Sequence, residues 1–467
     1  MPFQGKCGIT AVKKKGEFMM GYVVRQTPCG SVRGMDMGEG YALFRNIPYA
    51  TANRWERPVE VTDWEGEWDA STPTPWCPQA GTYATERDRY AAFYGYENTA
   101  KQAVFYSEDC QRLNIWMPDG AQKAPVLVYI HGGSYCNGGS SNPAYNSAGY
   151  AKKGLVAVTI NYRLNAFGSA VGGGHTGNYG LWDQITALTW IQHNIAAFGG
   201  DPDRVTIIGE SAGAMSVQDL VWSPLAAGLF HGAIMMSGGG ILPLYFARRR
   251  PQEAERVWEI IRKTLGAEDW EQMRSVPAET LYRTWLRVTT AEKYLTPATP
   301  VIDGITIPDE PLALAKSGRI NNVPMIIGLL SEDMWPNTLY EAALEWGLLM
   351  EEAGCGPVYG YYFDRQLPGS DHGAFHGADI RYAFGTFDTS WRPFEAVDYR
   401  ISENIMDYFT AFATTGVPGV QDLAKWEPLG KDQTKFLNFG DAPCAMIRVP
   451  ADRLIATQAK DQPFPKL

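Results

Sequence analysis

The sequence lacks the features that usually mark a nucleic-acid-binding or metal-binding protein. Its 41 basic residues are outnumbered by 51 acidic ones, so the net charge is −10, which argues against a nucleic-acid or anionic-membrane partner. Its cysteines show no C-x-x-C or Cys/His ligand spacing, so we expect no metal site and mostly buried free thiols. The seven cysteines are Cys7, Cys29, Cys77, Cys110, Cys136, Cys355 and Cys444.

The sequence also has no long apolar run. Its most apolar stretch, residues 226–247, is interrupted by His231, Ser237 and three glycines at 238–240. A strand followed by a loop explains it better than a membrane span does. Residues 1–6 lack the charged start and apolar core of a signal peptide. We therefore expect a cytoplasmic protein without a membrane span, the alternative being a secreted protein whose leader was removed.

Enough apolar sequence is present for a large core, since 45% of the 467 residues are hydrophobic and 20% are charged. No repeat or linker divides the chain, so residues 1–467 are predicted to form a single domain. Short apolar strands alternate with helical stretches, which predicts an α/β fold with a mostly parallel sheet flanked by helices. Residues 252–292 look helical, and we expect a helical insertion over about 252–322 at the active-site entrance. The predicted strands are 113–117, 126–130, 155–160, 204–208, 233–236, 324–327 and 358–363, and the clearest helix is 181–195.

The most informative motif is the segment G-E-S-A-G at residues 209–213. It follows the β-branched run 204–208 and precedes the helical stretch 214–220. A G-x-S-x-G turn between a strand and a helix is typical of a nucleophile elbow, which exposes the serine hydroxyl at the top of a sheet. Ser211 is therefore the candidate nucleophile.

A serine hydroxyl needs an adjacent base, and only six histidines are available. His131 directly follows a strand in H-G-G-S and suits an oxyanion loop. The N–H groups of Gly133 and Ser134 in this loop, with that of Ala212 after the nucleophile, would stabilise an oxyanion. Losing one such donor typically raises a barrier by about 3–4 kcal/mol. His193 is expected on a helix surface and His231 in a structural role, whereas His175, in a glycine-rich loop, stays open. His372 and His376 lie well after Ser211, as the order Ser, acid, His requires.

Longer segments occur in a characteristic order along nearly the whole chain. They are F-R-N-I-P-Y-A at 44–50, S-E-D-C at 107–110, L-N at 113–114, N-Y-R-L at 161–164, G-N-Y-G-L-W-D-Q at 177–184 and F-G-G-D-P at 198–202. Together with residues 209–213, they resemble the type-B carboxylesterase family of cholinesterase-like esterases and lipases, and we expect a bacterial carboxylesterase. The resemblance implies an α/β-hydrolase fold, no cofactor and hydrolysis of carboxylic esters through an acyl-enzyme. We expect a monomer or dimer that acts on a small-molecule ester.

The same resemblance assigns the remaining roles. It implies that His376, in A-F-H-G-A-D-I, is the base, with His372 as the runner-up. The family's acid is a glutamate in G-x-N-x-D-E-G, and here G-L-L-S-E-D-M at 328–334 places Asp333 at that position. Because an aspartate is one methylene shorter, its backbone must approach the histidine by about 1 Å more. Glu332 is the alternative acid.

Three further features have both a functional and a structural interpretation. Glu210 either tunes the field at the nucleophile or makes only structural hydrogen bonds. Ser237 either supports the acid or is simply a buried, backbone-bonded serine. Cys77 and Cys110 occupy positions that resemble a family disulfide, which a cytoplasmic protein would keep reduced.

The predicted activity is serine-dependent hydrolysis of short-to-medium acyl or aryl esters. A lipase, an acyltransferase or an amidase would use the same residues, and a catalytically silent binding protein would lack the serine. Aromatic residues could line an entrance suited to aryl esters, or could merely pack the core. They are Tyr83, Tyr90, Phe93, Tyr94, Tyr96, Trp391 and Phe394.

Overall fold

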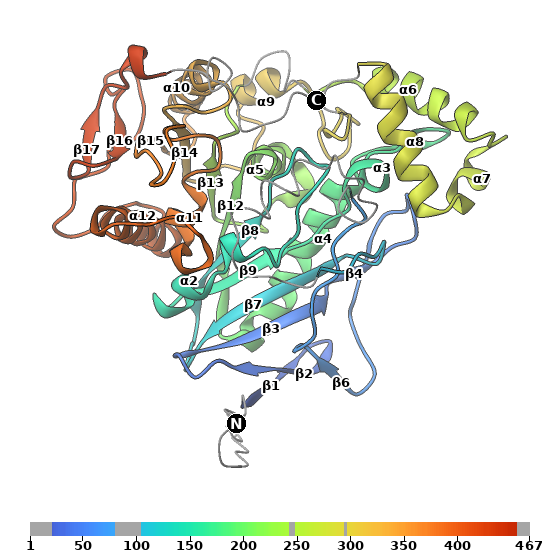
Figure 1. The fold of residues 1–467 in the computed structure, drawn as a ribbon, viewed down its shortest axis with the longest axis horizontal. Coiled ribbons are helices and arrows are strands. Elements are labelled where there is room, and N and C mark those ends of the chain that lie inside the picture. The colour runs from blue at the N-terminus through green and yellow to red at the C-terminus, as the bar shows by residue number, and fades with distance from the viewer. Residues whose placement is uncertain (1–20, 80–103, 242–247, 294–296, 455–467) are drawn as a thin grey trace.

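A large twisted β-sheet runs through the centre of the protein in the computed structural model, which describes residues 21–79, 104–241, 248–293 and 297–454 (Figure 1). Its strands lie in the order β1-β2-β3-β7-β9-β8-β12-β13-β14-β15-β16-β17, and β6 pairs with β2. These strands are β1 Tyr22–Thr27, β2 Gly30–Asp36, β3 Tyr41–Pro48, β6 Glu67–Asp69, β7 Arg112–Pro118, β8 Ala124–Ile130, β9 Val156–Ile160, β12 Gly200–Glu210, β13 Gly232–Met236, β14 Met325–Leu330, β15 Val358–Phe363, β16 Phe436–Phe439 and β17 Ala445–Ile447. Two small ribbons pair β4 Ala50–Thr51 with β5 Val59–Glu60, and β10 Val171–Gly172 with β11 His175–Thr176.

The sheet is parallel from β9 through β8, β12, β13, β14 and β15 to β16. The predicted parallel strands are therefore confirmed in the part of the sheet that carries the Ser211 turn. The pairs β1–β2, β2–β3, β3–β7, β7–β9 and β16–β17 are antiparallel. Short turns such as the one between β1 and β2 can join only antiparallel neighbours, whereas parallel neighbours need a long crossover.

Helices cover both faces of the central strands. In β8, Val126, Val128 and Ile130 belong to one hydrophobic cluster, whereas Leu127 and Tyr129 belong to another. The first cluster includes apolar residues of α4 Tyr179–Asn194, α5 Ala212–Trp222 and α10 Pro336–Glu352. The second includes residues of α2 Ala148–Lys152, α11 Ile380–Phe384 and α12 Ala396–Thr415. Alternate residues of a strand point to opposite faces, so these strands are apolar throughout because both faces are buried.

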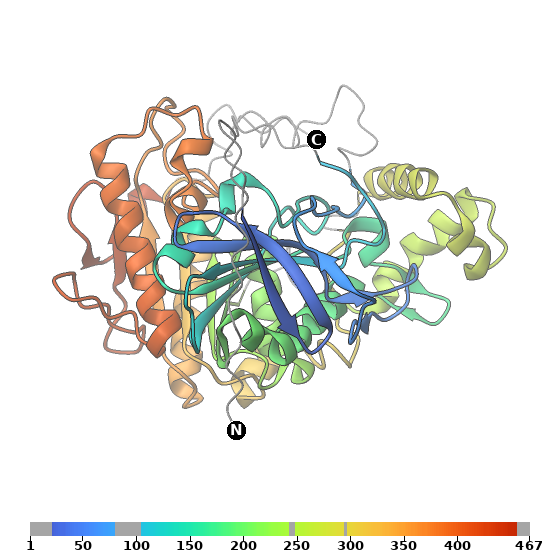
Figure 2. The same cartoon turned by 90° about the horizontal axis from the view of Figure 1, so that it is seen from below.

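Three helices form a group at one end of the molecule, opposite α12, β16 and β17 (Figures 1 and 2). They are α6 Pro251–Thr264, α7 Trp270–Ser275 and α8 Ala278–Ala291. In α6, Ala254, Val257, Trp258 and Ile261 are buried, which is the spacing of a single apolar helix face. This group lies within the predicted insertion 252–322, and its position at a substrate entrance stays a prediction. The other α-helices within the described residues are α3 Asn165–Gly168 and α9 Pro311–Ser317.

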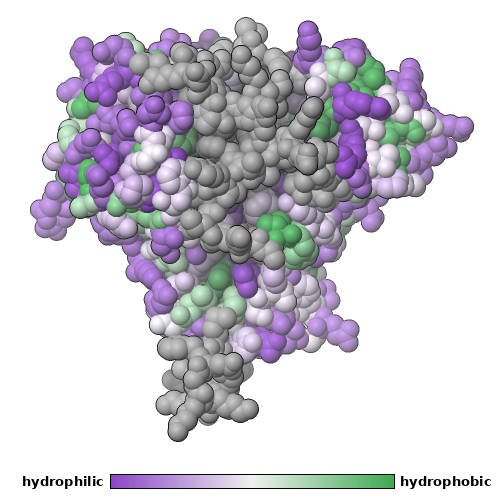
Figure 3. All heavy atoms as spheres, viewed as in Figure 1, coloured by the Kyte–Doolittle hydropathy of each residue, from purple (hydrophilic) through white to green (hydrophobic). Residues whose placement is uncertain are grey.

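Within the described ranges, no helix is both long and apolar enough to cross a membrane. The described part of the face in Figure 3 is mainly hydrophilic, with hydrophobic residues in small separate groups. Scattered apolar residues of this kind are ordinary on a protein surface.

Candidate active site

Ser211 lies in a sharp turn between the end of β12 and the start of α5. Its backbone has φ 57° and ψ −123°, a conformation that a residue with a side chain rarely adopts. The backbone N–H of Ser211 donates a hydrogen bond of 2.9 Å to the carbonyl of Met236, at the end of the neighbouring strand β13. The turn is therefore held in a strained geometry by the sheet.

The glycines on either side of Ser211 are required by close backbone approaches. A Cβ atom on Gly209 would lie 2.3 Å from the carbonyl carbon of Gly213. A Cβ atom on Gly213 would lie 2.1 Å from the carbonyl oxygen of Ile130, at the end of β8. Both distances are far below van der Waals contact, so the G-x-S-x-G pattern follows from the packing of α5 against β8 and β12.

His376 lies beside Ser211 and joins it to Asp333. The Nδ1 atom of His376 is 2.7 Å from Oδ1 of Asp333, and Nε2 is 2.8 Å from Oγ of Ser211. In the neutral imidazole, Nδ1–H donates to Asp333 because a carboxylate only accepts hydrogen bonds, so Nε2 can accept the serine proton. This is the arrangement in which histidine acts as a general base toward a serine hydroxyl.

The three residues come from different parts of the chain. Ser211 follows β12, Asp333 follows β14, and His376 lies between β15 and α11. These strands are parallel, so their carboxyl ends meet at one edge of the sheet, where ligands bind in open α/β sheets. The topology therefore assembles residues that are up to 165 positions apart.

Asp333 reaches the imidazole despite its short side chain, and it is fully buried. The backbone N–H of Met334 donates to its Oδ1 at 2.7 Å. Burial raises the pKa of Asp333, but the charge and hydrogen bond of His376, the Ser237 hydroxyl and the Met334 N–H lower it more, so the pKa lies below its ordinary value. The carboxylate is thus kept ionised to orient His376.

Glu332 is directed elsewhere. Its Oε2 accepts a hydrogen bond of 2.8 Å from the N–H of Ala374 and another from the Ser331 hydroxyl. The backbone of Glu332 also forms an isolated parallel bridge with Phe375. Glu332 therefore stabilises the loop that carries His376, through a hydrogen bond two residues before the histidine. Because Asp333 and not Glu332 contacts the imidazole, the geometry favours Asp333 as the acid.

The segment after β8 contains Gly133 and Ser134, two of the three residues predicted as oxyanion donors. Gly133, Ser134 and Tyr135 have φ values of 105°, 56° and 58°. Among the described residues, no acceptor takes a hydrogen bond from the N–H groups of Gly133 and Ser134. Ala212 is the first residue of α5, where backbone N–H groups lack a partner within the helix. A Cβ atom on Gly132 would lie 3.1 Å from Cβ of Ser211, which places this segment against the nucleophile.

Two more carboxyl groups lie buried around the histidine. Oε1 of Glu210 is 3.3 Å from Nε2 of His376. The carboxyl group of Asp379, three residues after His376, accepts a hydrogen bond of 2.6 Å from the Tyr361 hydroxyl. Asp379 was not among the predicted site residues, although its place in A-F-H-G-A-D-I is visible in the sequence.

This cluster shifts several ionisations. Burial lowers the pKa of His376, but the charges of Asp333 and Glu210 raise it by a larger amount, so that it lies at about 9. Burial raises the pKa of Glu210 to about 8, although the charge of His376 opposes the rise. Burial also raises the pKa of Asp379 to about 7, against the hydrogen bond from Tyr361. Strongly shifted groups of this kind cluster at functional sites.

Replacing Glu210 tests this coupling. A neutral His376 is needed as the base, so kcat/KM rises as pH passes the pKa of His376. An ionised Glu210 raises that pKa, so we expect Glu210→Gln to move the acid limb of the kcat/KM profile to lower pH. Glu332→Gln is the matched control and should leave the limb in place, because Glu332 binds the backbone of Ala374. A shift to higher pH, or equal shifts in both variants, would contradict the coupling.

The other five histidines have different surroundings. His131 stacks on Tyr162, and burial lowers its pKa to about 4. The Nδ1 atom of His175 lies 2.9 Å from the Tyr179 hydroxyl, and that of His231 accepts from the backbone of Val205. His193 is on the exposed surface of α4, as predicted, with Nδ1 2.8 Å from Glu60. His372 is partly exposed, with Nδ1 3.9 Å from Asp371.

Two other predictions concern cysteines and aromatic residues. Cys77 and Cys110 are buried, neighbouring free thiols, and the hydrogen bond with Cys77, together with burial, raises the pKa of Cys110. Phe394 packs on Phe387, with ring centroids 4.2 Å apart, whereas Trp391 is 37% exposed. Tyr83, Tyr90, Phe93, Tyr94 and Tyr96 lie outside the described residues.

Within the described ranges, no cluster of His, Cys, Asp and Glu could hold a metal ion.

Comparison with known proteins gives a consistent result. The model of the carboxylesterase family matches residues 22–345 and 334–457. The para-nitrobenzyl esterase of Bacillus subtilis (strain 168) is 29% identical, over 86% of this chain and 92% of that protein. The phenmedipham hydrolase of Pseudarthrobacter oxydans is also 29% identical, over 91% of this chain and 96% of that protein.

Solved structures agree with these matches. A thermophilic PNB esterase superposes with a TM-score of 0.80 and 26% identity, covering 92% of this chain and 99% of that one. Another PNB esterase structure gives a TM-score of 0.79 and 27% identity, covering 95% of this chain and 99% of that one. The similarity therefore extends over nearly the whole length of both proteins.

Proposed function

The chain belongs to the carboxylesterase family, and on this basis we propose that it hydrolyses short-to-medium acyl and aryl esters through an acyl-enzyme on Ser211. It has the α/β-hydrolase fold and is a carboxylesterase. The observation that carries the assignment of residues is the chain of hydrogen bonds from Ser211 through His376 to Asp333, at 2.8 and 2.7 Å.

In the first half of the proposed reaction, Ser211 Oγ attacks the ester carbonyl carbon while its proton passes to Nε2 of His376. Asp333 keeps the imidazole in the tautomer that accepts this proton and stabilises the resulting cation. The negative oxygen of the tetrahedral intermediate accepts hydrogen bonds from the N–H groups of Gly133, Ser134 and Ala212. The intermediate then expels the alcohol, which takes its proton from Nε2.

In the second half, a water molecule takes the place of the alcohol. His376 removes a proton from the water, which attacks the acyl carbon and forms a second tetrahedral intermediate. Collapse of this intermediate releases the carboxylic acid and returns the proton to Ser211 Oγ. Glu210, 3.3 Å from Nε2, contributes further negative potential at the charged imidazole once its own carboxyl group is ionised.

The aryl preference rests on the relatives. One is named a para-nitrobenzyl esterase and another a phenmedipham hydrolase. The surrounding loops, rather than the Ser211 turn, determine which ester fits.

A panel of esters tests the proposed substrate class. We expect kcat/KM for p-nitrophenyl acetate and butyrate to exceed that for emulsified long-chain triglycerides by about 10-fold or more. The anilide of the same acid, which has a poorer leaving group, should be cleaved more slowly still. Faster turnover of the emulsion would indicate a lipase, and faster cleavage of the anilide would indicate an amidase.

A further inference from the structure

The loop that supplies two of the proposed oxyanion donors is strained. Ser134 and Tyr135 are consecutive residues with side chains, and both have positive φ values, 56° and 58°. Each such residue is unfavourable unless the surrounding structure holds it in place. Ser134 is exposed, whereas Tyr135 is only 6% exposed. The side chain able to hold this loop is therefore that of Tyr135.

The Tyr135 hydroxyl is hydrogen-bonded to a buried ion pair formed by Arg248 and Asp219, and Asp219 belongs to α5. The Nε and Nη2 atoms of Arg248 each lie 2.7 Å from a different carboxylate oxygen of Asp219. The Nη2 atom also donates to the Tyr135 hydroxyl at 3.0 Å, and that hydroxyl lies 3.5 Å from Oδ2 of Asp219. Asp219 is fully buried and Arg248 is 6% exposed. A planar guanidinium that binds a carboxylate at two points has a fixed orientation, so it fixes the hydroxyl as well.

The same arginine reaches the helix that follows the nucleophile. Nη2 of Arg248 lies 3.3 Å from the backbone carbonyl of Met215, and Asp219 is two turns along α5 from Ser211. The proposed oxyanion donors come from two segments, because Gly133 and Ser134 follow β8 while Ala212 begins α5. Arg248, Asp219 and Tyr135 connect these two segments.

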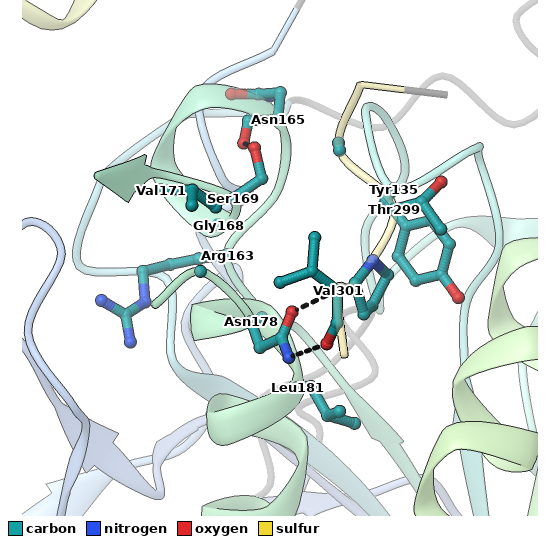
Figure 4. A pocket seen from close by; sticks show the side chains of 14 residues that line it. Tyr135, Arg163, Asn165, Gly168, Ser169, Val171, Asn178, Leu181, Thr299 and Val301 are labelled. Carbon is teal, nitrogen blue, oxygen red and sulfur yellow. Dashed lines mark hydrogen bonds between the residues drawn. The ribbon is translucent and has the colours of Figure 1, made fainter. Parts of the chain in front are cut away.

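Backbone contacts also hold the loop, and Tyr135 is one of the residues that line a small cavity. The carbonyl of Tyr135 accepts from the N–H of Asn165 at 2.7 Å. A cavity of about 20 Å³, enough for one water molecule, lies between Tyr135 and Arg163 (Figure 4). The hydroxyl contacts with Arg248 and Asp219 therefore orient the tyrosine side chain in addition to its packing.

We propose that Tyr135, Asp219 and Arg248 form a positioning unit that sets the oxyanion loop against the start of α5. The proposal rests on the proposed function, since it assigns the N–H groups of Gly133, Ser134 and Ala212 to the same oxyanion. None of the three side chains touches the reacting atoms. Their effect is on the distance between donors, and displacements of about 1 Å in such a site can reduce rates by about 10²-fold.

A second group of the same composition provides a matched control. Arg365 binds Asp398 at 2.8 Å, and the Tyr382 hydroxyl donates to the same carboxylate at 2.6 Å. Tyr382 is in α11 and Asp398 is in α12, at the other end of the molecule from α6–α8. Removing either tyrosine hydroxyl leaves its arginine–aspartate ion pair intact, but only Tyr135 belongs to the proposed oxyanion loop.

The experiment compares Tyr135→Phe with Tyr382→Phe in the full chain. For p-nitrophenyl acetate, we expect Tyr135→Phe to lower kcat by about 10-fold with KM within twofold. Affinity for a trifluoromethyl ketone, which forms a tetrahedral oxyanion with serine, should fall by about the same factor, and affinity for the matching methyl ketone should not. Arg248→Lys, which keeps the charge but loses the two-point contact, should reproduce the pattern. Tyr382→Phe should change none of these quantities by more than twofold.

The outcomes separate the two proposals. Hydrolysis that survives Ser211→Ala contradicts the proposed function. If Ser211→Ala abolishes hydrolysis but Tyr135→Phe keeps kcat and ketone affinity within twofold, the positioning unit alone is contradicted. Equal losses in Tyr135→Phe and Tyr382→Phe, or a loss in Tyr135→Phe confined to KM, would also contradict it.

Discussion

Ser211→Ala is expected to lower kcat for p-nitrophenyl acetate by about 10⁵- to 10⁶-fold, because every covalent step requires the Oγ atom. Alanine removes the attacking oxygen and leaves His376 without a proton to accept. The substrate and the oxyanion donors are still present, so KM should change little. The residual rate reflects binding and oxyanion stabilisation alone. Stopped-flow or steady-state release of p-nitrophenol measures it.

Ser223→Ala is the control for this variant. Ser223 directly follows α5 and is fully buried, so it presents a comparable loss of one hydroxyl. We expect its kcat to remain within twofold of the wild type. If Ser211→Ala retained more than about 1% of the wild-type rate, the assignment of the nucleophile would be wrong.

The second large effect is expected for Asp333→Asn, which should lower kcat by about 10⁴-fold. Asparagine has nearly the same shape, but its amide can donate to Nδ1 and so favours the histidine tautomer that carries its proton on Nε2. That tautomer cannot accept the proton of Ser211. The variant also removes the negative charge that stabilises the imidazolium. The measurement is kcat for the same ester, with thermal unfolding to check that the variant is folded.

Glu332→Gln is the matched comparison, since Glu332 is the adjacent carboxylate. Its side chain accepts from the backbone of Ala374 and does not orient the imidazole, and glutamine can still accept this bond. We expect kcat to fall by less than about 10-fold. A collapse of kcat in Glu332→Gln together with a mild effect of Asp333→Asn would reverse the assignment of the acid.

Local sequence was sufficient to predict the Ser211 turn and its neighbours. A β-branched run, two glycines around a serine and a helical stretch specify one strand–turn–helix unit, and β12 and α5 occupy those positions. The glycines can be interpreted from sequence because their close approaches lie within this unit or on the adjacent strand β8. The parallel centre of the sheet could be predicted for a similar reason, because apolar strands alternate with helices along the sequence.

The partners of Ser211 could not be derived in the same way. Asp333 and His376 are separated from it by long stretches whose path depends on the whole sheet, so family resemblance was needed to choose them from several carboxylates and histidines. The contact of Glu210 with the imidazole requires the turn geometry in three dimensions. Asp379 lies in the same short segment as His376, but the burial that raises its pKa and its hydrogen bond from Tyr361 arise only in the fold.

The Tyr135–Asp219–Arg248 unit illustrates the same limit. Arg248 is one of three consecutive arginines, a pattern that is typical of solvated surface, yet its side chain is buried in the structure. Burying an arginine is unfavourable unless a carboxylate neutralises it, and here Asp219, 29 positions away, does so. A buried pair of this kind has no periodic signal in either segment.

The most direct test of the account is to identify the residue that becomes covalently modified. The intact protein is treated with a fluorophosphonate, digested and examined by mass spectrometry, in parallel with Ser211→Ala. The account predicts one phosphonyl group per chain, on the peptide that contains Ser211, together with loss of ester hydrolysis in proportion to labelling. Hydrolysis that persists in the fully labelled protein, or a stoichiometric label on another residue, would contradict it.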